Sequence, residues 1–214
     1  MNPPRRVHLI LFVAFLLATV FCYRFLDIPV AYWCRRLDRA VLNIAQAVTR
    51  FGKSTAYLIA AFLLFLFFRF VRKRDIFANR SLFVFSSVAV SGIAVNVAKW
   101  IAGRYRPVML FDQGRYGFVF FRTDYKGTSF ASGHAVTAFS LALALSFLFP
   151  KYRVPLFLAA AAVAASRVLL TAHFLGDVVF GAYIGIATVL VLKAVFERRA
   201  PLYRLPGSGT SPGT

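Results

Sequence analysis

Long apolar stretches separated by short basic segments make up most of the chain. The apolar stretches run over residues 9–25, 56–70, 82–102, 131–149, 154–171 and 178–196. A helix needs about 20 mostly apolar residues to cross the ~30 Å hydrocarbon core of a bilayer, and these stretches approach that length. The pattern therefore predicts an all-α fold, a polytopic membrane protein with six transmembrane helices.

Residues 28–51 follow a different pattern. Apolar side chains recur there at alternating steps of four and three, while Arg, Asn and Gln fall elsewhere around the helix. The apolar positions are Val30, Cys34, Leu37, Val41, Ile44, Val48 and Phe51. This spacing predicts an amphipathic helix that lies in the membrane interface. A loop helix packed against its neighbours is the alternative interpretation.

Composition agrees with a membrane protein of one domain over residues 1–200. Hydrophobic residues make up 60% of the 214 positions, 25 of them Phe, which is more than a soluble domain of this size can bury. The tail at 201–214 is rich in Gly, Ser and Pro and is expected to be disordered. The formal charge of +19 is spread among the apolar stretches. It therefore points to anionic lipid headgroups and argues against nucleic acid.

Six spans would place both chain ends on the same side of the membrane. Basic residues divide almost evenly between the two sides. The short segment 72–80 carries four of them, and short basic loops favour the cytoplasm. We therefore expect cytoplasmic termini, with 28–51 and the loop at 103–130 on the opposite side of the membrane.

Polar residues cluster where the third and fourth spans meet that opposite side. Lys99 and Arg106 are seven residues apart at the end of the third span, so they share a helix face while the helix continues. Pro107 is expected to end the regular structure. The fourth span begins with Ser132 and Gly133, whose hydroxyl and N–H groups suit an anion at a helix N-terminus.

The fifth span ends with three ionisable residues. A second histidine, His134, follows the Ser-Gly pair at the start of the fourth span. Arg167, His173 and Asp177 are costly at membrane depth, and such residues usually serve a function. Because His173 and Asp177 are four apart, the carboxylate can accept the imidazole proton and orient the ring. A helix-end Arg and Asp that reach the interface, beside an ordinary histidine, is the alternative interpretation of this stretch.

Taken together, these groups predict metal-independent phosphoryl transfer. Three cations and a helix N-terminus can hold the equatorial oxygens of a phosphoryl group. Of two histidines, one can attack phosphorus while the other protonates the leaving oxygen. A site for Mg²⁺ or Ca²⁺ would need clustered carboxylates, which these segments lack. We therefore expect neither a metal nor any other cofactor.

The same residues form a pattern that resembles the three-part signature of the type 2 phosphatidic acid phosphatase superfamily. Its parts are Lys99-x6-Arg106-Pro107, then Ser132-Gly133-His134, then Ser166-Arg167-x5-His173-x3-Asp177. The family usually has Pro before Ser-Gly-His, where this chain has Ala131, so a slightly looser helix start is expected. The resemblance implies a six-helix membrane phosphatase.

The resemblance also implies a role for each residue of the signature. His173 would be the nucleophile that forms a phosphohistidine, with Asp177 orienting it, and His134 would be the general acid. The phosphate would be held by Lys99, Arg106, Ser132, Gly133 and Arg167. A non-catalytic lipid-binding or transport protein would account for these cations, but it would not require His173 and Asp177 at a four-residue spacing.

Two shorter segments resemble bacterial members that act on the lipid A 1-phosphate. They are the Phe51-Gly52-Lys53-Ser54 turn and the Gly127-Thr128-Ser129-Phe130 approach to the second motif. This implies a multi-pass protein of a bacterial inner membrane, with the active site facing the periplasm and an anionic phospholipid or glycolipid as substrate. Undecaprenyl diphosphate, phosphatidylglycerophosphate and transfer of the phosphoryl group to another lipid stay open.

Basic residues outside the signature are candidates for headgroup contacts. They are Arg104, Arg115, Arg122 and Lys126 in the 103–130 loop, with Lys53 in the turn before the second span. Loop charges solvated near anionic lipid are the alternative. The oligomeric state is left open.

Overall fold

The computed structural model describes residues 3–198, so the tail expected at 201–214 lies outside the described residues. Within that range every regular element is a helix. The β-structure in that range is limited to two isolated β-bridges, which join Arg104 to Phe118 and to Thr128. The chain is therefore all-α, as the sequence pattern predicts.

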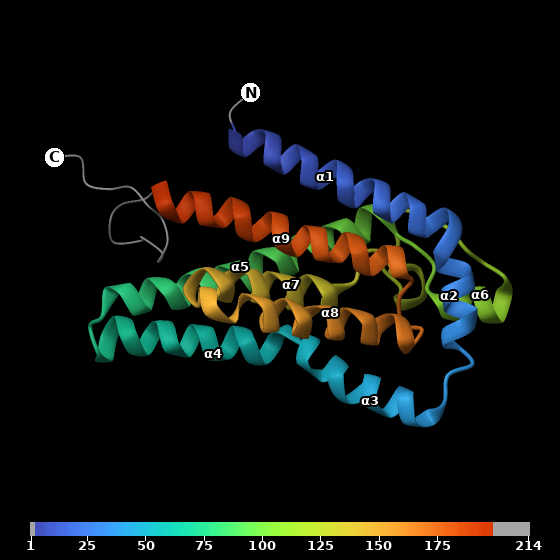
Figure 1. Ribbon diagram of the computed structural model, residues 1–214, viewed down its shortest axis with the longest axis horizontal. Coiled ribbons are helices and arrows are strands. Elements are labelled where there is room, and N and C mark those ends of the chain that lie inside the picture. The colour runs from blue at the N-terminus through green and yellow to red at the C-terminus, as the bar shows by residue number, and fades with distance from the viewer. Residues whose placement is uncertain (1–2, 199–214) are drawn as a thin grey trace.

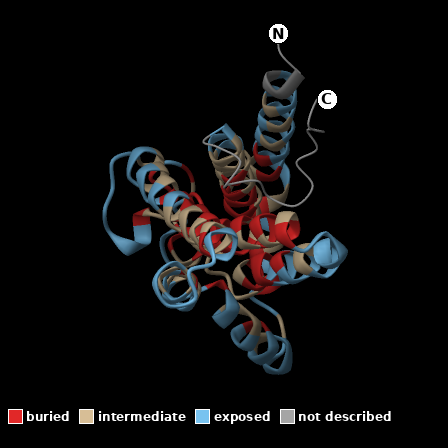
Figure 2. Ribbon diagram, turned by 90° about the vertical axis from the view of Figure 1, so that its left-hand side faces the viewer, coloured by how far each residue is buried: buried red, intermediate tan, exposed pale blue. Residues whose placement is uncertain are grey.

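Helix α7 (Gly133–Leu148) lies at the centre of the bundle (Figure 1). Its neighbours are α5 (Asp75–Ala102), α8 (Arg153–Leu169) and α9 (Leu175–Arg198), while α4 (Ser54–Leu66) packs on α5 and α1 (Pro3–Phe21) packs on α9. Buried residues gather along these central contacts, and exposed residues cover the outside (Figure 2). Apolar side chains on the outer surface suit a lipid environment.

Five helical stretches are long and apolar enough to cross a membrane by length and composition. They are Arg6–Cys34, Arg39–Val71, Asp75–Ala102, Pro150–Leu169 and Leu175–Arg198. The apolar α7, with 16 residues, is shorter than these five. All six apolar stretches of the sequence therefore fall on helices of a polytopic membrane protein, and the count of six spans stays a prediction.

Residues 28–51 do not form the single amphipathic helix that their spacing predicts. The first helix passes through the π-helical turn η1 (Cys22–Leu26) into α2 (Asp27–Cys34). The chain then leaves the helical conformation, and the amphipathic α3 (Arg39–Thr49) packs on α8. Asp38 has extended backbone angles at the N-cap of α3, a position that Asp favours. The apolar spacing continues through this break, which is why periodicity alone missed it.

The 103–130 segment contains helical structure that the sequence prediction omitted. Helix α5 ends at Ala102, and its C-cap is Gly103, whose φ of +37° is a conformation that glycine adopts easily. Pro107 was expected to end the regular structure, but it begins the short helix α6 (Pro107–Gln113). Proline lacks a backbone N–H, but the N–H groups in the first turn of a helix have no partner within the helix, so proline is well tolerated there. The remaining short elements are the 3-10 turns η2 (Arg50–Gly52), η4 (Tyr125–Gly127) and η5 (Pro150–Tyr152), and the π-helical turn η3 (Phe67–Val71).

Two glycines of α9 allow close packing on α7. A Cβ added at Gly185 would lie 2.7 Å from the carbonyl oxygen of Val136 and 3.0 Å from the backbone nitrogen of Ser140. A Cβ added at Gly181 would lie 2.8 Å from the carbonyl oxygen of Ser132. Small residues at such positions let two membrane helices approach closely. This contact holds the N-terminal turn of α7 against α9.

Gly185→Ala is expected to destabilise the protein by roughly 1–3 kcal/mol, because backbone atoms of α7 would have to move away from the new methyl group. Thermal unfolding of the purified protein in detergent measures the effect. Gly92→Ala is the matched control, since a Cβ at Gly92 would meet no atom within 4 Å. Equal unfolding temperatures for the two variants would contradict this account of the α7–α9 contact.

Candidate active site

The three signature segments meet at one end of the bundle. The end of α5, the start of α7 and the turn between α8 and α9 all lie at the right-hand end of Figure 1. Helix α7 presents its N-terminus there. The structure thus brings residues more than 70 positions apart in the sequence into one site.

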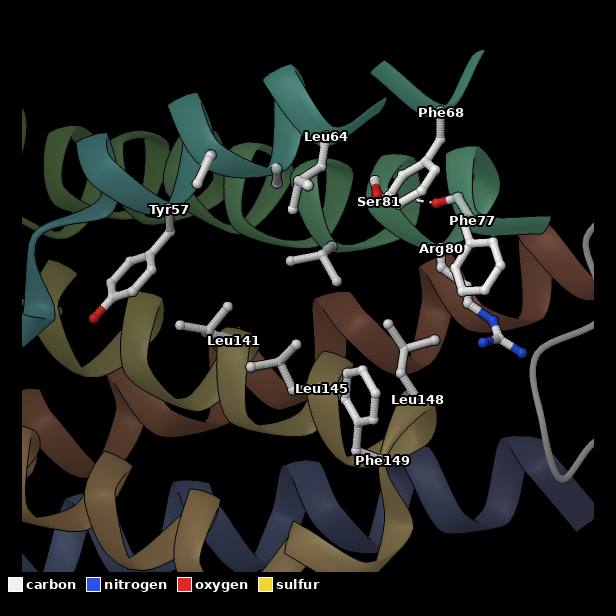
Figure 3. A pocket seen from close by; sticks show the side chains of 13 residues that line it. Tyr57, Leu64, Phe68, Phe77, Arg80, Ser81, Leu141, Leu145, Leu148 and Phe149 are labelled. Atoms are coloured by element: carbon white, nitrogen blue, oxygen red, sulfur yellow. Dashed lines mark hydrogen bonds between the residues drawn. The ribbon is translucent and has the colours of Figure 1, made fainter. Parts of the chain in front are cut away.

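An apolar cavity of about 380 Å³ lies elsewhere, between α4, α5 and the C-terminal part of α7 (Figure 3). Leu141, Leu145 and Leu148 line it from α7, Phe77 lines it from α5, and Phe68 lines it from the turn η3 that follows α4. Its few polar neighbours cannot stabilise a phosphate as several converging cations would. The candidate residues of the signature lie instead at the other end of α7.

Arg106 is held rigidly beside His173. The guanidinium donates from Nε to the carbonyl of Tyr125 at 2.7 Å and from Nη1 to the carbonyl of Ala172 at 2.8 Å. The ring of Tyr125 lies against the same guanidinium, 4.0 Å from centroid to Cζ. Nη1 is also 3.4 Å from Nε2 of His173. A buried cation is thus fixed at the Nε2 edge of the imidazole.

The partners of His173 define its tautomer. Nδ1 lies 2.8 Å from the carbonyl oxygen of Ser129, which can only accept, so Nδ1 carries the proton. Nε2 faces Arg106, which can only donate, so Nε2 keeps its lone pair. Burial lowers the pKa of His173 to about 4, the charges of Arg106 and Lys99 acting in the same direction and that of Asp177 opposing them. The imidazole is therefore neutral near pH 7, with a lone pair available for nucleophilic attack.

Asp177 lies beside the ring, as the spacing predicts, but the contact differs from the expected one. Its Oδ2 is 3.8 Å from Nδ1 of His173, too far for a hydrogen bond. Oδ2 instead accepts from the hydroxyl of Ser129 at 2.6 Å and from the backbone N–H of Phe174 at 2.9 Å. Asp177 thus holds the residues on both sides of the ring, and the carbonyl of Ser129 orients the ring directly.

The cations of the signature converge on the same space. Lys99 Nζ and Arg106 Nη2 both donate to the carbonyl of Thr128, at 3.0 and 3.4 Å. Arg167 Nη1 donates to the hydroxyl of Thr49 at 2.8 Å, so the last residue of α3 helps to place it. Within residues 3–198 none of the ion pairs involves these three cations. Cations that lack carboxylate partners, and are held by carbonyl and hydroxyl oxygens instead, are suited to bind an anion.

The start of α7 supplies further groups. Ser132 is the N-cap, and its N–H donates to the carbonyl of Asp177 at 3.0 Å, so this N–H is not free for a phosphate. Its buried hydroxyl has no hydrogen-bond partner among the described residues. A Cβ added at Gly133 would meet nothing within 4 Å, so there is open space at the first turn, where helix N–H groups lack partners.

His134 lines a cavity of about 320 Å³ together with Lys99, Lys53 and Gly133. The charges of Arg167, Lys53, Lys99 and Arg106 all act on its imidazole. Gly52 packs on His134 so closely that a Cβ there would lie 2.5 Å from Cδ2 of the ring. The turn before α4 therefore fixes the second histidine from outside the three signature segments.

The candidates for headgroup contacts separate into two groups. Lys53 lines the cavity with His134, and Arg115, Arg122 and Lys126 are exposed. Arg104 differs, because it is 0% exposed and pairs with Asp27 and Asp177 at 2.6 Å each. A headgroup cannot reach it, so the expectation that Arg104 contacts the lipid is wrong.

Several residues of the site were not found by sequence reasoning. Asp27 and Tyr116 surround Arg104, Ser129 holds His173, and Thr49 holds Arg167. Asp27 carried a usable signal, since a carboxylate at the end of an apolar stretch is costly unless it is paired. The other three are ordinary hydroxyl residues whose positions depend on the tertiary fold.

The candidate site thus combines a neutral histidine with cations that lack carboxylate partners, in an all-helical membrane fold, and this arrangement suits an anionic group such as a phosphate. Residues 80–201 match the model of the PAP2 superfamily, and the chain belongs to this family. It is a phosphatase that acts on lipid phosphates.

Relatives and solved structures agree with this assignment. The chain is 30% identical to the lipid A 1-phosphatase of Rhizobium johnstonii, over 97% of this chain and 88% of that protein. It is 29% identical to the lipid A 1-phosphatase of Rhizobium etli, over 97% and 92%.

Two crystal structures share the fold. One is a PAP2-type phosphatidylglycerolphosphate phosphatase from Bacillus subtilis, with a TM-score of 0.62, 18% identity and coverage of 91% of this chain and 98% of that one. The other is LpxE from Aquifex aeolicus, with a TM-score of 0.58, 21% identity and coverage of 78% and 94%. At these identities the likeness concerns the fold alone.

Proposed function

We propose that this protein removes the 1-phosphate of lipid A through a phosphohistidine on His173, without a metal ion, at the periplasmic face of a bacterial inner membrane. The observation that carries the proposal is the state of His173. Its Nε2 lone pair faces a buried cation, while Nδ1 is committed to the carbonyl of Ser129. A nucleophile aimed into a cluster of unpaired cations suits attack on a phosphate.

In the first half of the reaction, Nε2 of His173 attacks phosphorus and the bond from phosphorus to the lipid oxygen breaks. Lys99, Arg106 and Arg167 stabilise the charge on the phosphoryl oxygens, with the hydroxyl of Ser132 and the first N–H groups of α7. His134, protonated when the anionic substrate is bound, gives its proton to the leaving oxygen. The products are the dephosphorylated lipid and phosphohistidine.

In the second half, His134 is neutral and accepts a proton from a water molecule as that water attacks phosphorus. The bond from phosphorus to Nε2 breaks, inorganic phosphate leaves, and His173 regains its lone pair. Both histidines thus return to their starting states. The cations serve both halves, because the phosphorus stays in the same place.

The donor set favours chemistry without a metal. Within residues 3–198 no three His, Cys, Asp or Glu side chains gather closely enough to hold a metal ion. The carboxylates of Asp27 and Asp177 are already engaged by Arg104. Three cations at the phosphate would repel a divalent ion and can themselves supply the electrostatic stabilisation that the ion would give.

Lipid A as the substrate is supported by the two relatives, which match over nearly the whole chain. Lys53, in the cavity with His134, adds a cation where a phosphorylated glycolipid would lie. The amphipathic α3, with Arg167 attached through Thr49, suits a substrate that arrives from the membrane interface. The basic segment 72–80 at the other end of the bundle supports a periplasmic site.

The test is phosphate release by the purified protein in detergent with EDTA present. Lipid A, undecaprenyl diphosphate, phosphatidylglycerophosphate and phosphatidic acid are compared at equal surface concentration. We expect fastest release from lipid A, from the 1-position, at a rate that EDTA does not change. Loss of activity in EDTA with recovery on adding Mg²⁺ would contradict the metal-free mechanism, and preference for another lipid would contradict the substrate.

A further inference from the structure

Arg104 joins two buried carboxylates that come from opposite ends of the sequence. Its Nη2 donates to Oδ2 of Asp27 and its Nη1 donates to Oδ1 of Asp177, both at 2.6 Å. The side chains are 1% exposed for Arg104 and 0% for each Asp. A cation so enclosed, between two carboxylates, holds all three groups in a single geometry.

Aromatic rings enclose this triad and exclude water from it. The guanidinium carbon of Arg104 lies 4.6 Å from the ring centroid of Phe174, 4.9 Å from that of Tyr23 and 5.0 Å from that of Tyr116. The hydroxyl of Tyr116 accepts from Nη2 of Arg104 at 2.8 Å and donates to the carbonyl of Tyr23 at 2.7 Å. Charge interactions are strong in such an enclosure.

Asp27 connects the first membrane helix to the turn that carries His173. Its Oδ1 accepts from the backbone N–H of Gly176, in the first turn of α9, at 2.8 Å. A Cβ at Gly176 would lie 3.2 Å from Oδ2 of Asp27, so close approach favours glycine there. The π-helical turn Cys22–Leu26 comes directly before Asp27 and changes the register of the helix, a device that is frequent at functional sites.

The contacts of Asp177 complete a chain that leads to the nucleophile. One carboxylate oxygen is held by Arg104, and the other holds the hydroxyl of Ser129 and the N–H of Phe174. The carbonyl of Ser129 in turn accepts from Nδ1 of His173. Each link is a hydrogen bond of 2.6–2.9 Å between buried groups.

We propose that Arg104 and Asp27 are positioning residues for phosphoryl transfer, because Arg104 holds Asp177 where it fixes the two neighbours of His173, and Asp27 holds Arg104 and the first turn of α9. The proposal rests on His173 being the nucleophile. It gives the first membrane helix a part in catalysis, although that helix carries no residue of the signature.

A second consequence concerns charge. The charged groups facing His173 are Asp177 on one side and Arg106 and Lys99 on the other. Arg104 balances Asp177, so the carboxylate attracts a proton to the imidazole only weakly. Without Arg104 the uncompensated carboxylate would favour the imidazolium, and the pKa of His173 would rise. With a raised pKa, the imidazole of His173 would gain a proton at a higher pH as the pH is lowered. The loss of activity on the acid side would therefore begin at a higher pH.

The experiment compares Arg104→Gln, Arg104→Lys and Asp27→Asn in the full-length protein, purified in detergent, with wild type and His173→Gln alongside. We expect Arg104→Gln to lower kcat by about 10²-fold through displacement of the nucleophile, while the inhibition constant of inorganic phosphate changes by less than about 3-fold. The acid limb of kcat/KM should move to higher pH. Arg104→Lys should keep the acid limb in place, because a charge remains, yet recover only part of kcat.

The double variant Asp27→Asn with Arg104→Gln removes a buried carboxylate together with the cation. Because it leaves fewer buried charges uncompensated than Arg104→Gln alone, we expect it to fold even if the single variant unfolds. It should show the same loss of kcat and the same shift of the acid limb. Arg69→Gln is the matched control, since its pair with Asp75 is about half exposed, and it should leave both kcat and the pH profile unchanged.

Each outcome separates this proposal from the proposed function. If wild type is inactive or His173→Gln stays active, the phosphohistidine mechanism fails. If those two behave as expected but Arg104→Gln keeps the wild-type kcat and acid limb, the positioning role fails alone. Equal losses of kcat and of phosphate affinity, with no shift of the acid limb, would reduce Arg104 and Asp27 to structural residues.

Discussion

His173→Gln is expected to lower the rate of phosphate release by about 10⁴-fold or more, because no other group would form the covalent intermediate. Glutamine has a similar size and can still donate from its amide to the carbonyl of Ser129, so the fold should survive. Binding of the lipid should be nearly unchanged, since the cations that hold the phosphate stay in place. Phosphate release and lipid binding are measured on the same detergent preparation.

His8→Gln is the matched control for this variant. His8 lies in α1, which begins at the end of the bundle opposite the candidate site (Figure 1), and it is expected to leave turnover unchanged. Isolation of phosphoprotein from wild type after rapid quenching, and its absence from His173→Gln, would identify the intermediate directly. Turnover by His173→Gln within about 10-fold of wild type would exclude a nucleophilic role for this residue.

Arg106→Gln is expected to lower kcat/KM by about 10³-fold. The substitution removes a charge that would lie against the phosphoryl group, and it releases three carbonyl oxygens, of Tyr125, Ala172 and Thr128, from a common donor. Nε2 of His173 would also lose its neighbouring cation. The affinity for inorganic phosphate should fall together with the rate, unlike the result expected for Arg104→Gln.

Arg115→Gln is the control here, because Arg115 lies in the same connecting segment between α5 and α7 but is exposed. It is expected to alter kcat/KM by no more than about 2-fold, as surface charges usually contribute little. Kinetic constants for the three proteins and inhibition by inorganic phosphate give the comparison. An Arg106→Gln variant with normal phosphate affinity would show that this cation does not hold the substrate.

The sequence was sufficient for the all-α membrane fold and for the signature of the family. Apolar stretches of membrane length admit few other structures, because backbone groups in a bilayer must bond within a helix. Part of the signature was visible because charge is expensive in an apolar stretch, so Arg167, His173 and Asp177 stood out individually. Local turns were harder to predict from the sequence. The break before α3 and the helix that begins at Pro107 are two examples.

Only the tertiary structure decided how these residues are connected. A spacing of four placed Asp177 near His173, but the ring N–H donates to the carbonyl of Ser129, because the segment before α7 lies closer to Nδ1 than the carboxylate does. In the sequence Arg104 resembles any other loop cation, whereas in the structure it pairs with Asp27 and Asp177. Sequence periodicity reports which face of one helix a residue occupies, whereas the partner of a buried charge depends on which other helices pack there.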